Sequence, residues 1–594
     1  MPLLSKSDFI LAQDCLAKLY FKRNGYASTN DENLFLQSLA KMGNVVGEIA
    51  KVQFPGGTEI GMSRNPMQAV DDTATWLKSN DTGILYEATF SADGCYARVD
   101  VLVKIGSSIE LIEVKSSGVD ASQKSNRKLF NKAFDSKLND LTFQYLTAKN
   151  QYPEFTFEPF LALVDKDVQN TIPNLYQNFK VVKLPKAGNF QGYDISYLGN
   201  QEELKSLQLL HIEPCMDLVS SRLQSVGLDI SRFIEAYEDP KDFERFKSPL
   251  GSHCSKCEFR TTPLNESGIA RCWGNKISVE PHILDVAKDA HFSPAITELI
   301  QNEGASSIME IPEDLMYTKT GTERVNGRPL FQRSGESERI DSALFEELDS
   351  LRYPLFFIDF ETIRPAVPYH LDLYPYDIEL FQWSVHKQSS QGGKIEHFEF
   401  LNDTYGNPND AFIRSLRDCI GNSGTILTWS SYENTQIRKY LNDLSEDQKV
   451  VDPSLLSWLT SILKDKDGGY RQVDMHDDWI KKMYFHKDMK GRTSIKVVLP
   501  AILSETNPQA NIDLLTQVGL YKVKDGGIVD PYKLLERVSD GGKAMEAYEE
   551  LICSPNLPGS NPTELRKQLL EYCRLDTLSM VVIFNYLKFK HSQR

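Results

Sequence analysis

The sequence lacks any apolar run that approaches the ~20 residues needed to span a membrane. Charged side chains interrupt its first residues, so no secretory signal is visible. It also has no G-x-x-x-x-G-K-[ST] phosphate-binding loop, which argues against a helicase, and no internal repeat or low-complexity segment. These absences predict a cytoplasmic globular protein without membrane association.

An excess of basic residues is also absent. The formal net charge is -16, with 82 acidic and 66 basic side chains. A protein that only coats nucleic acid should be basic, so the charge weakens that class of function. It suits sites that gather carboxylates around divalent cations, although an acidic surface that favours solubility explains the same number. The nine cysteines are expected to be reduced, so clustered cysteines indicate metal rather than disulfides.

The length of 594 residues suggests about two to four domains. Helical patterns, a strand-rich section and a cysteine cluster occupy residues 1–275. A connector with a short helical pattern follows over 276–345, and residues 346–594 open with an apolar strand and close with a long helix. We therefore expect an α/β protein with two main domains.

The first group of candidate residues lies on a hairpin. Two apolar-alternating runs flank the turn at 106–108. Side chains alternate faces along a strand, so Glu113 and Lys115 point the same way, and Asp100 on the partner strand can reach that face. Two carboxylates can hold a divalent cation that activates water, while the lysine lies beside that water or stabilises charge on phosphorus. An edge hairpin with solvated charges is the alternative.

This segment resembles the RecB-like nucleases of the PD-(D/E)xK type, including AddB and CRISPR-associated members. Their core has Asp, then Glu-x-Lys, then a helical Gln-x-x-x-Tyr. Asp100, Glu113 and Lys115 match this pattern, and Gln144 matches the helical glutamine. Tyr145 follows that glutamine directly instead of four residues later. The resemblance implies a PD-(D/E)xK fold, with Mg²⁺ or Mn²⁺ held by the two carboxylates.

Two further carboxylates stand near this motif. Glu48 takes the place on an upstream helix where the family often has a histidine ligand. Glu87 is another candidate, for which a structural role is the alternative.

A cysteine cluster follows. Cys254 and Cys257 form a C-x-x-C pair, and Cys272 comes shortly after. A closed tetrahedral site needs a fourth ligand, and both zinc and iron–sulfur clusters accept four thiolates. His253 in a zinc site, or Cys215 as the fourth thiolate, are possible completions.

The RecB-like relatives that carry iron–sulfur clusters place one cysteine before the nuclease core and three after it. Cys15 occupies the early position. The resemblance therefore implies a 4Fe–4S cluster held by Cys15, Cys254, Cys257 and Cys272, with Zn²⁺ as the alternative.

The second group of candidate residues begins on an apolar strand at 355–358. Asp359 and Glu361 follow two apart, hence on one face. Carboxylates at the end of a buried strand are costly unless they bind cations. Near the chain's end, Tyr572 and Asp576 are four apart on a long helix and share a face.

A third element supplies Glu433, in the first turn of a helix that follows a strand. The set resembles the DnaQ-like exonucleases of the ribonuclease H superfamily, whose signature is Asp-x-Glu, an Asp on a helix, and Tyr- or His-x-x-x-Asp. Asp359 and Glu361 match the first motif, and Tyr572 and Asp576 match the last. Glu433 stands where the family usually has Asp.

The DnaQ-like resemblance implies a ribonuclease H-like fold and two ions that clamp the scissile phosphate. Asp359 would bridge both ions, Glu361, Glu433 and Asp576 would complete the ligands, and Tyr572 would orient the attacking water. Asp474 is the alternative third ligand.

Two further segments, 364–377 and 494–502, resemble an uncharacterised bacterial family that fuses the two nuclease types. In that family the Ser-Ile-Lys motif recurs, and Lys496 either contacts phosphate or simply begins a helix.

These resemblances imply a metal-dependent nuclease that acts on DNA ends, in repair or in defence against foreign DNA, with a separate helicase as partner. A second hypothesis has one active domain, with the other binding nucleic acid. A third is a non-catalytic scaffold or an RNA-processing factor, because DnaQ-like folds also degrade RNA.

Overall fold

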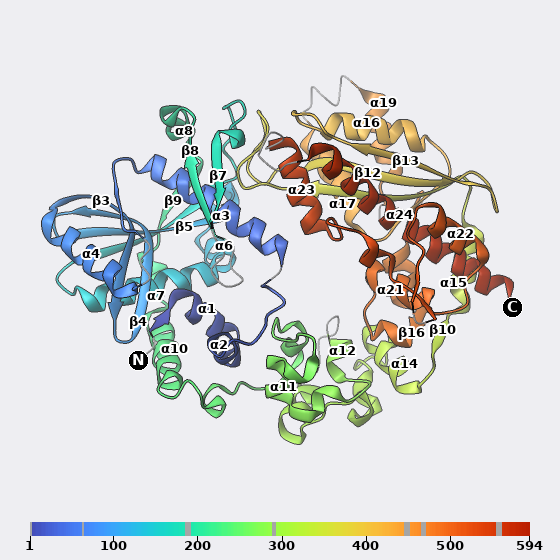
Figure 1. Cartoon of the computed structure of the whole chain (residues 1–594), viewed down its shortest axis with the longest axis horizontal. Helices are drawn as coiled ribbons and strands as arrows, with labels where there is room; N and C mark the ends of the chain where they lie inside the picture. Colours follow the sequence, from blue (N-terminus) through green and yellow to red (C-terminus); the bar gives the residue numbers. More distant parts are fainter. Residues whose placement is uncertain are drawn as a thin grey trace. The chain divides into compact units, whose positions relative to one another are not determined.

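The chain forms two compact units, each a mixture of helices and mixed β-sheet (Figure 1). Unit 1 comprises residues 1–249, 258–272 and 364–377, and unit 2 comprises 250–257, 273–363 and 378–594. No helix in the described part of the chain is both long and apolar enough to cross a bilayer. The computed structural model describes residues 3–31, 33–61, 65–184, 192–287, 293–444, 452–464, 471–524, 526–553 and 561–594.

Unit 1 is built around one main sheet with helices packed on it, and strands β7 (Phe179–Lys183) and β8 (Tyr193–Tyr197) form a separate pair. The other strands of the unit are β1 (Leu4–Ser5), β2 (Thr58–Glu59), β3 (Thr82–Ala92), β4 (Cys95–Ile105), β5 (Ser108–Val119), β6 (Thr156–Asp165) and β9 (Leu210–Pro214). Its helices are α1 (Lys6–Asp14), α2 (Leu16–Arg23), α3 (Leu34–Gln53), α4 (Pro66–Ser79), α5 (Ala121–Ser125), α6 (Arg127–Ala133), α7 (Asp135–Gln151), α8 (Gln201–Leu207), α9 (Met216–Ser220), α10 (Leu223–Tyr237) and α11 (Gly268–Trp273).

The main sheet of unit 1 has the order β2-β3-β4-β5-β6-β9, with β1 beside β4. Strands β3, β4 and β5 are antiparallel neighbours, whereas β5 and β6 run parallel and are connected through α7. A parallel pair needs such a crossover, and α7 packs its apolar side on the sheet. Leu138 and Leu141 of α7 join the core with Leu111 of β5 and Leu161 of β6. The helix that carries Gln144 is thereby fixed against the strands that carry the Glu-x-Lys motif.

Segment 364–377 belongs to unit 1 although it connects two neighbouring strands of unit 2. The Asn170 side chain donates to the His370 carbonyl at 3.0 Å, and backbone bonds join Asn170 to Leu373 and Asp372. The Tyr376 ring packs over Gly118, where an added Cβ would lie 2.8 Å from the ring. This segment, which we call the strap, is therefore a structural part of unit 1.

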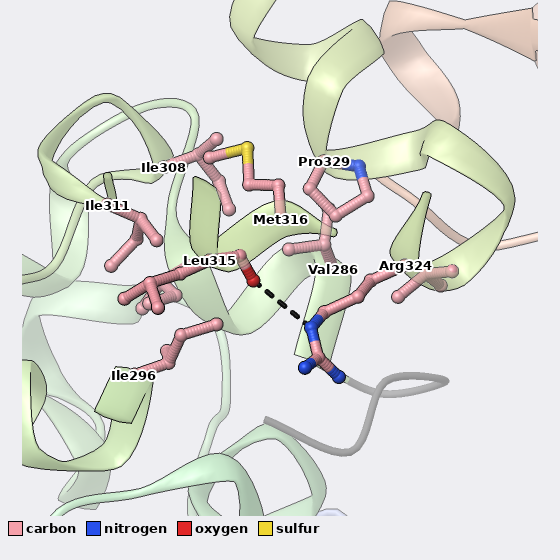
Figure 2. A pocket seen from close by; sticks show the side chains of 10 residues that line it. Val286, Ile296, Ile308, Ile311, Leu315, Met316, Arg324 and Pro329 are labelled. Atoms are coloured by element: carbon pink, nitrogen blue, oxygen red, sulfur yellow. Dashed lines mark hydrogen bonds between the residues drawn. The ribbon is translucent and has the colours of Figure 1, made fainter. Parts of the chain in front are cut away.

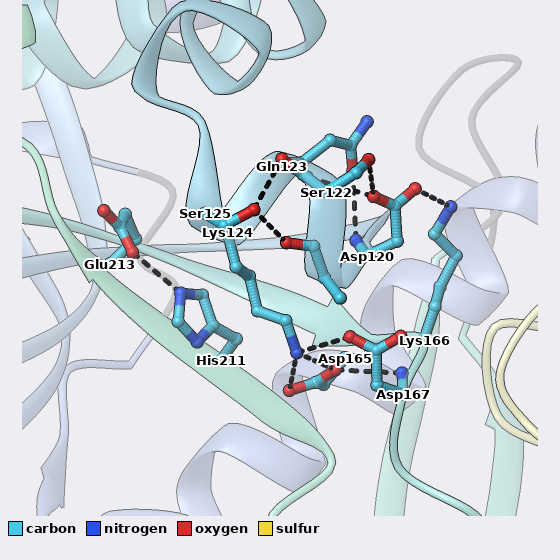
Figure 3. A network of polar contacts seen from close by, with 11 residues as sticks. Asp120, Ser122, Gln123, Lys124, Ser125, Asp165, Lys166, Asp167, His211 and Glu213 are labelled. Atoms are coloured by element: carbon cyan, nitrogen blue, oxygen red, sulfur yellow. Dashed lines mark hydrogen bonds and ion pairs between the residues drawn. The ribbon is translucent and has the colours of Figure 1, made fainter.

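A charged network fixes the chain where it leaves β5 and β6 (Figure 3). Lys124 lies 2.8 Å from Asp165 and 2.7 Å from Asp167, and Lys166 lies 3.0 Å from Asp120. Asp120 also caps α5, because its carboxylate accepts the backbone N–H of the third helical residue. These ion pairs hold the backbone just beyond the end of β5.

Unit 2 contains a second sheet and the longest helix of the described chain. Its strands are β10 (Glu338–Ile340), β11 (Leu355–Ile363), β12 (Glu379–Gln388), β13 (Ile395–Leu401), β14 (Thr425–Thr428), β15 (Gln472–Asp474), β16 (Tyr484–His486), β17 (Val523–Lys524) and β18 (Gly527–Ile528). Its helices are α12 (Ile283–Ala287), α13 (Pro294–Glu298), α14 (Arg328–Ser334), α15 (Ser342–Ser350), α16 (Asn409–Ile420), α17 (Tyr432–Asp443), α19 (Pro453–Ile462), α20 (Lys481–Met483), α21 (Ile495–Leu503), α22 (Gln509–Gln517), α23 (Gly541–Cys553) and α24 (Pro562–Ser592).

The sheet of unit 2 has the order β13-β12-β11-β14-β15, in which β11 is antiparallel to β12 and parallel to β14. Phe356, Ile358 and Phe360 of β11 face a core that α16, α17 and α19 complete. The intervening residues of β11 face the other side, where the Phe357 ring lies 5.5 Å from that of Phe584 on α24. Strand alternation thus places Asp359 and Glu361 on the side of the sheet that α24 covers.

The predicted connector, residues 276–345, lies in unit 2. Its expected short helix is α13, which continues as a π-helical turn to Glu303. A small apolar pocket is lined by side chains such as Val286, Ile308 and Met316 (Figure 2). Arg324 closes one side of the pocket, and its Nε donates to the Leu315 carbonyl at 3.1 Å. The connector therefore has a small apolar core of its own.

Candidate active sites

The first candidate site lies on β4, β5 and α7 of unit 1. The ladder between β4 and β5 ends at the Val101–Ile112 pair, and beyond it the Asp100 side chain accepts the Val114 N–H at 2.7 Å. The carboxylate takes the place of a backbone acceptor, which fixes Asp100 beside Glu113. The structure thus brings together two of the predicted ligands.

Glu113 is the centre of this site. Its side chain is 1% exposed and accepts hydrogen bonds on both oxygens. Lys115 Nζ and Lys6 Nζ lie 2.5 and 2.8 Å from Oε1, and Gln144 Nε2 donates to Oε2 at 2.6 Å. The predicted Glu-x-Lys pair and the predicted helical glutamine therefore meet at one carboxylate.

Two residues of this site were not predicted. Asp140 Oδ2 lies 2.6 Å from Lys115 Nζ, and Lys6 is the second ammonium on Glu113. Asp140 precedes Gln144 by four residues on α7 and shares its face, so helical spacing could have indicated it. Nothing local indicates Lys6, which lies 107 residues before Glu113.

The charges in this site shift one another's pKa values. Burial raises the pKa of Asp100 well above its usual value, and the neighbouring Glu113 charge adds to the shift. Burial also opposes ionisation of Glu113, but Lys115 and Lys6 outweigh it and lower its pKa. Burial disfavours a charged Lys115, yet Glu113 and Asp140 raise its pKa above the ordinary value. Lys115 is therefore a cation at neutral pH.

The weaker candidates of unit 1 have other contacts. Glu48 on α3 accepts the Tyr197 N–H at 3.2 Å, and Tyr145 packs against the hydrophobic core. Glu87 lies in β3 with a left-handed φ of 58° and pairs with Arg98 at 2.5 Å. Its charge still raises the pKa of Asp100, so Glu87 borders the site.

The second candidate site lies on β11 and α24 of unit 2. Asp359, Glu361 and Asp576 each offer a carboxylate oxygen, and these oxygens lie within 4.8 Å of one another. The strand supplies the first two because they are two residues apart, and α24 crosses that face of the sheet. Three of the four carboxylates that the DnaQ-like resemblance implies as metal ligands are therefore together.

Glu433 faces the same group from the first turn of α17. It is 3% exposed, and its Oε2 has no hydrogen-bond partner in the described part of the chain. Burial raises the pKa of Glu433 to about 8, helped by the Asp474 and Asp576 charges. An unpaired buried carboxylate oxygen is costly, and a bound cation would remove that cost.

The alternative ligand, Asp474, has partners of its own. It ends β15, and its Oδ1 accepts the backbone N–H groups of His476 and Asp477 at 3.0 and 2.8 Å. These three residues could also hold a cation, since their ligand atoms lie within 4.8 Å. Because Asp474 already caps the turn that follows it, Glu433 is the better candidate to join Asp359, Glu361 and Asp576 as a fourth ligand.

Tyrosines and a lysine surround Asp576. The Tyr532 hydroxyl donates to Asp576, and Tyr572 also hydrogen-bonds this carboxylate. Lys496 Nζ donates to the Tyr572 hydroxyl at 3.4 Å and lies about 5 Å from the centres of both tyrosine rings. Tyr532 was not predicted, since it lies on a short 3-10 turn without a recognisable motif.

The pKa shifts of this group follow from crowded acids. Burial raises the pKa of Glu361 to about 8, and the Asp576 charge adds to it while Lys496 opposes it. Burial, then Asp576 and Glu433, raise the pKa of Asp359 well above its usual value. The Cys573 thiol donates to Asp359 at 3.5 Å, which favours its ionised form. Four crowded acids with raised pKa values, three of them buried and Asp359 half-buried, fit a site for divalent cations.

The proposed cluster cysteines are divided between the units. Cys15 and Cys272 belong to unit 1, and Cys254 and Cys257 belong to unit 2. Across the described residues, which include all nine cysteines, no disulfide forms. The 4Fe–4S cluster stays a prediction.

The alternative ligands of the cysteine cluster differ in their surroundings. His253 Nε2 lies 3.6 Å from Cys254 Sγ, so these two side chains could share a cation. Cys215 lies in the core of unit 1, where its thiol donates to the Glu213 carbonyl at 3.2 Å and burial raises its pKa to about 12. The structure thus gives Cys215 a packing role.

Comparison with known proteins gives one family. Residues 356–494 match a family described as a domain of unknown function (DUF2779). No curated protein and no solved structure matches the chain. The matched segment includes Asp359, Glu361 and Glu433 and ends before Lys496 and Asp576.

Proposed function

We propose that the chain is a metal-dependent nuclease that hydrolyses phosphodiester bonds, most readily at DNA ends, with one catalytic site in each unit. The observation that carries the proposal is convergence in unit 2. Asp359, Glu361 and Asp576 present oxygens within 4.8 Å of one another, and Glu433, whose Oε2 has no hydrogen-bond partner among the described residues, faces them. Such a group suits two divalent cations that would polarise a phosphate and activate water.

In unit 2 the protein's own groups would orient the reactants. Asp359, Glu361, Glu433 and Asp576 would hold Mg²⁺ or Mn²⁺. The Tyr572 hydroxyl, which already bonds Asp576, would position the attacking water.

In unit 1, Asp100 and Glu113 would hold the cation, and Gln144 would orient Glu113 through its 2.6 Å hydrogen bond. Lys115 is held as a cation by Glu113 and Asp140, so it cannot accept a proton from water. It would instead stabilise the negative charge that develops on the phosphate. The 2.6 Å ion pair with Asp140 supports this role of the lysine.

The test compares wild type, Lys115→Ala and Asp359→Ala on single- and double-stranded DNA and RNA, labelled at the 5′ or 3′ end, with Mg²⁺ or Mn²⁺. We expect each substitution to abolish one activity and spare the other. If both variants retain every activity of the wild type, the site assignments are wrong. If the wild type cleaves none of the substrates, the nuclease proposal fails.

A further inference from the structure

Lys6 forms a second ammonium group over the carboxylates of unit 1. Its Nζ lies 2.8 Å from Glu113 Oε1 and 4.0 Å from Asp140 Oδ2. Lys115 Nζ contacts the same two carboxylates at 2.5 and 2.6 Å. Two lysines from distant parts of the chain therefore share one pair of acids.

The surrounding structure fixes the place of Lys6. It is the first residue of α1, and β1 just before it pairs with β4, the strand that carries Asp100. Further along α1, the buried Phe9 ring stacks on Phe143 at 4.9 Å, next to Gln144 on α7. Lys6 is thus held from both sides by the elements that build the site.

The two lysines differ in how they are held. Asp140 keeps Lys115 at 2.6 Å even if the Glu113 contact is lost, whereas Lys6 lies 4.0 Å from Asp140. A cation bound by Asp100 and Glu113 would repel the ammonium groups on Glu113. Because Lys6 lies farther from Asp140 than Lys115 does, Lys6 is the ammonium group that we expect such repulsion to release. Its side chain is 27% exposed, so it can turn toward solvent and an approaching strand.

We propose that Lys6 binds the phosphate backbone of the nucleic acid in the unit 1 site once a divalent cation takes its place on Glu113. This inference rests on the proposed nuclease function, and it assigns the N-terminal helix a direct part in substrate binding. An ammonium group on a flexible stem suits such a backbone contact, which positions the strand without reading its sequence.

The experiment measures binding of a short fluorescent single-stranded DNA oligonucleotide in Ca²⁺, with wild type, Lys6→Met and Lys6→Arg. We expect Lys6→Met to weaken binding about 10-fold and to lower the salt dependence by about one phosphate contact. Lys6→Arg should bind nearly as the wild type does. In a separate titration without DNA, Lys6→Met should bind Mn²⁺ at least as tightly as the wild type, because one competing ammonium is gone. Lys78→Met, on the exposed face of α4, is the control for the lost charge.

The outcomes distinguish a failure of the proposed Lys6 role from a failure of the nuclease proposal on which it rests. If the wild type neither binds nor cleaves nucleic acid, the nuclease proposal fails and the role of Lys6 fails with it. If Lys6→Met binds DNA as the wild type does, only the role of Lys6 is wrong. If Lys6→Met unfolds or loses Mn²⁺ affinity, Lys6 is structural. A folded Lys6→Arg variant that loses DNA binding would also contradict a phosphate contact.

Discussion

The side-chain amide of Asn170 donates to the backbone carbonyl of His370, 200 residues further along the chain, at 3.0 Å. Asn170 is fully buried, and its Oδ1 accepts the Ile172 N–H at 2.9 Å. One side chain thus joins the strap to the rest of unit 1 and orders its own turn.

Replacing this side chain should weaken the attachment of the strap. We expect Asn170→Ala to lower the free energy of unfolding of unit 1 by about 1–3 kcal/mol, because it leaves buried polar groups without a partner. Hydrogen exchange along β6 and the strap measures the change. Gln169→Ala removes an exposed hydrogen bond to the same strap, at 2.9 Å from Asp372, and should cost less than about 0.5 kcal/mol. Equal effects of the two variants would argue against this account.

Because the acids of unit 2 crowd together, we expect the removal of one of them to stabilise the metal-free protein. Asp359→Asn removes one ionisable carboxyl from beside Glu361, Glu433 and Asp576, so it should raise stability in EDTA by about 1 kcal/mol. It should also abolish the thermal stabilisation that Mn²⁺ gives to unit 2. Differential scanning calorimetry with and without Mn²⁺ measures both effects, and the exposed Asp513→Asn on α22 serves as control. Unchanged Mn²⁺ stabilisation in Asp359→Asn would remove Asp359 from the ligand set.

Tyr532 positions Asp576 in the proposed unit 2 site. We expect Tyr532→Phe to reduce the Asp359-dependent nuclease activity about 10–100-fold, as the loss of a group that orients a metal ligand does. Steady-state kinetics over a range of Mn²⁺ concentrations should show that the variant needs more Mn²⁺ to reach half of its maximal activity. Tyr548→Phe is the matched control, because it removes a buried hydroxyl that accepts from Asn402 at 2.8 Å. Equal losses of activity in the two variants would indicate general destabilisation.

We expect the stability of unit 2 to depend on pH through two histidines, His386 on β12 and His397 on β13. Burial, and then the Arg574 charge, lower the pKa of His397 to about 4. In the unfolded chain, His397 therefore binds a proton as the pH falls below about 6.5, whereas in the folded protein it stays neutral until about pH 4. The stability of the folded protein is consequently lost as the pH falls from 6.5 toward 4. At pH 5 the loss attributable to His397 should be about 2 kcal/mol.

His397→Gln should flatten this part of the profile in urea unfolding measured between pH 5 and pH 7. Burial raises the pKa of Glu399, 3.8 Å from the ring, and lowers that of the buried His386. Both groups therefore add to the pH dependence of stability, so the comparison is made between variant and wild type. An unchanged slope in His397→Gln would show that the ring is not the group responsible.

The cysteine prediction is tested by metal content. Protein purified without oxygen should be brown, with absorption in the blue region of the spectrum, if Cys15, Cys254, Cys257 and Cys272 hold a 4Fe–4S cluster. Cys272→Ser should lose the colour and the iron, whereas Cys419→Ser should keep both. If the protein contains only zinc, the iron–sulfur prediction is wrong and the alternative zinc site is supported.

Much of each site was predictable because its residues lie on regular elements. Alternation along β5 and β11 places Glu113 with Lys115, and Asp359 with Glu361, and helical spacing joins Tyr572 to Asp576. The turn at 106–108 also lies between β4 and β5 as expected.

The sequence could not indicate contacts that only the tertiary fold creates. Lys6 and Tyr532 reach their sites from elements without a motif, so no local pattern marks them. The strap was recognisable as a segment, but its place in unit 1 depends on the partner it finds at Asn170. The order of the strands in each sheet likewise comes from packing over long separations in the chain.

The position of Lys6 has a practical consequence for anyone who purifies this protein. Leu4 and Ser5 form a strand beside β4, and the very next side chain touches Glu113. An affinity tag joined ahead of Leu4 would therefore begin within a few residues of a carboxylate that we expect to bind metal, and a polyhistidine tag could compete for that ion. Tags are better attached after α24, whose last residues lie beyond the segment that carries Tyr572 and Asp576.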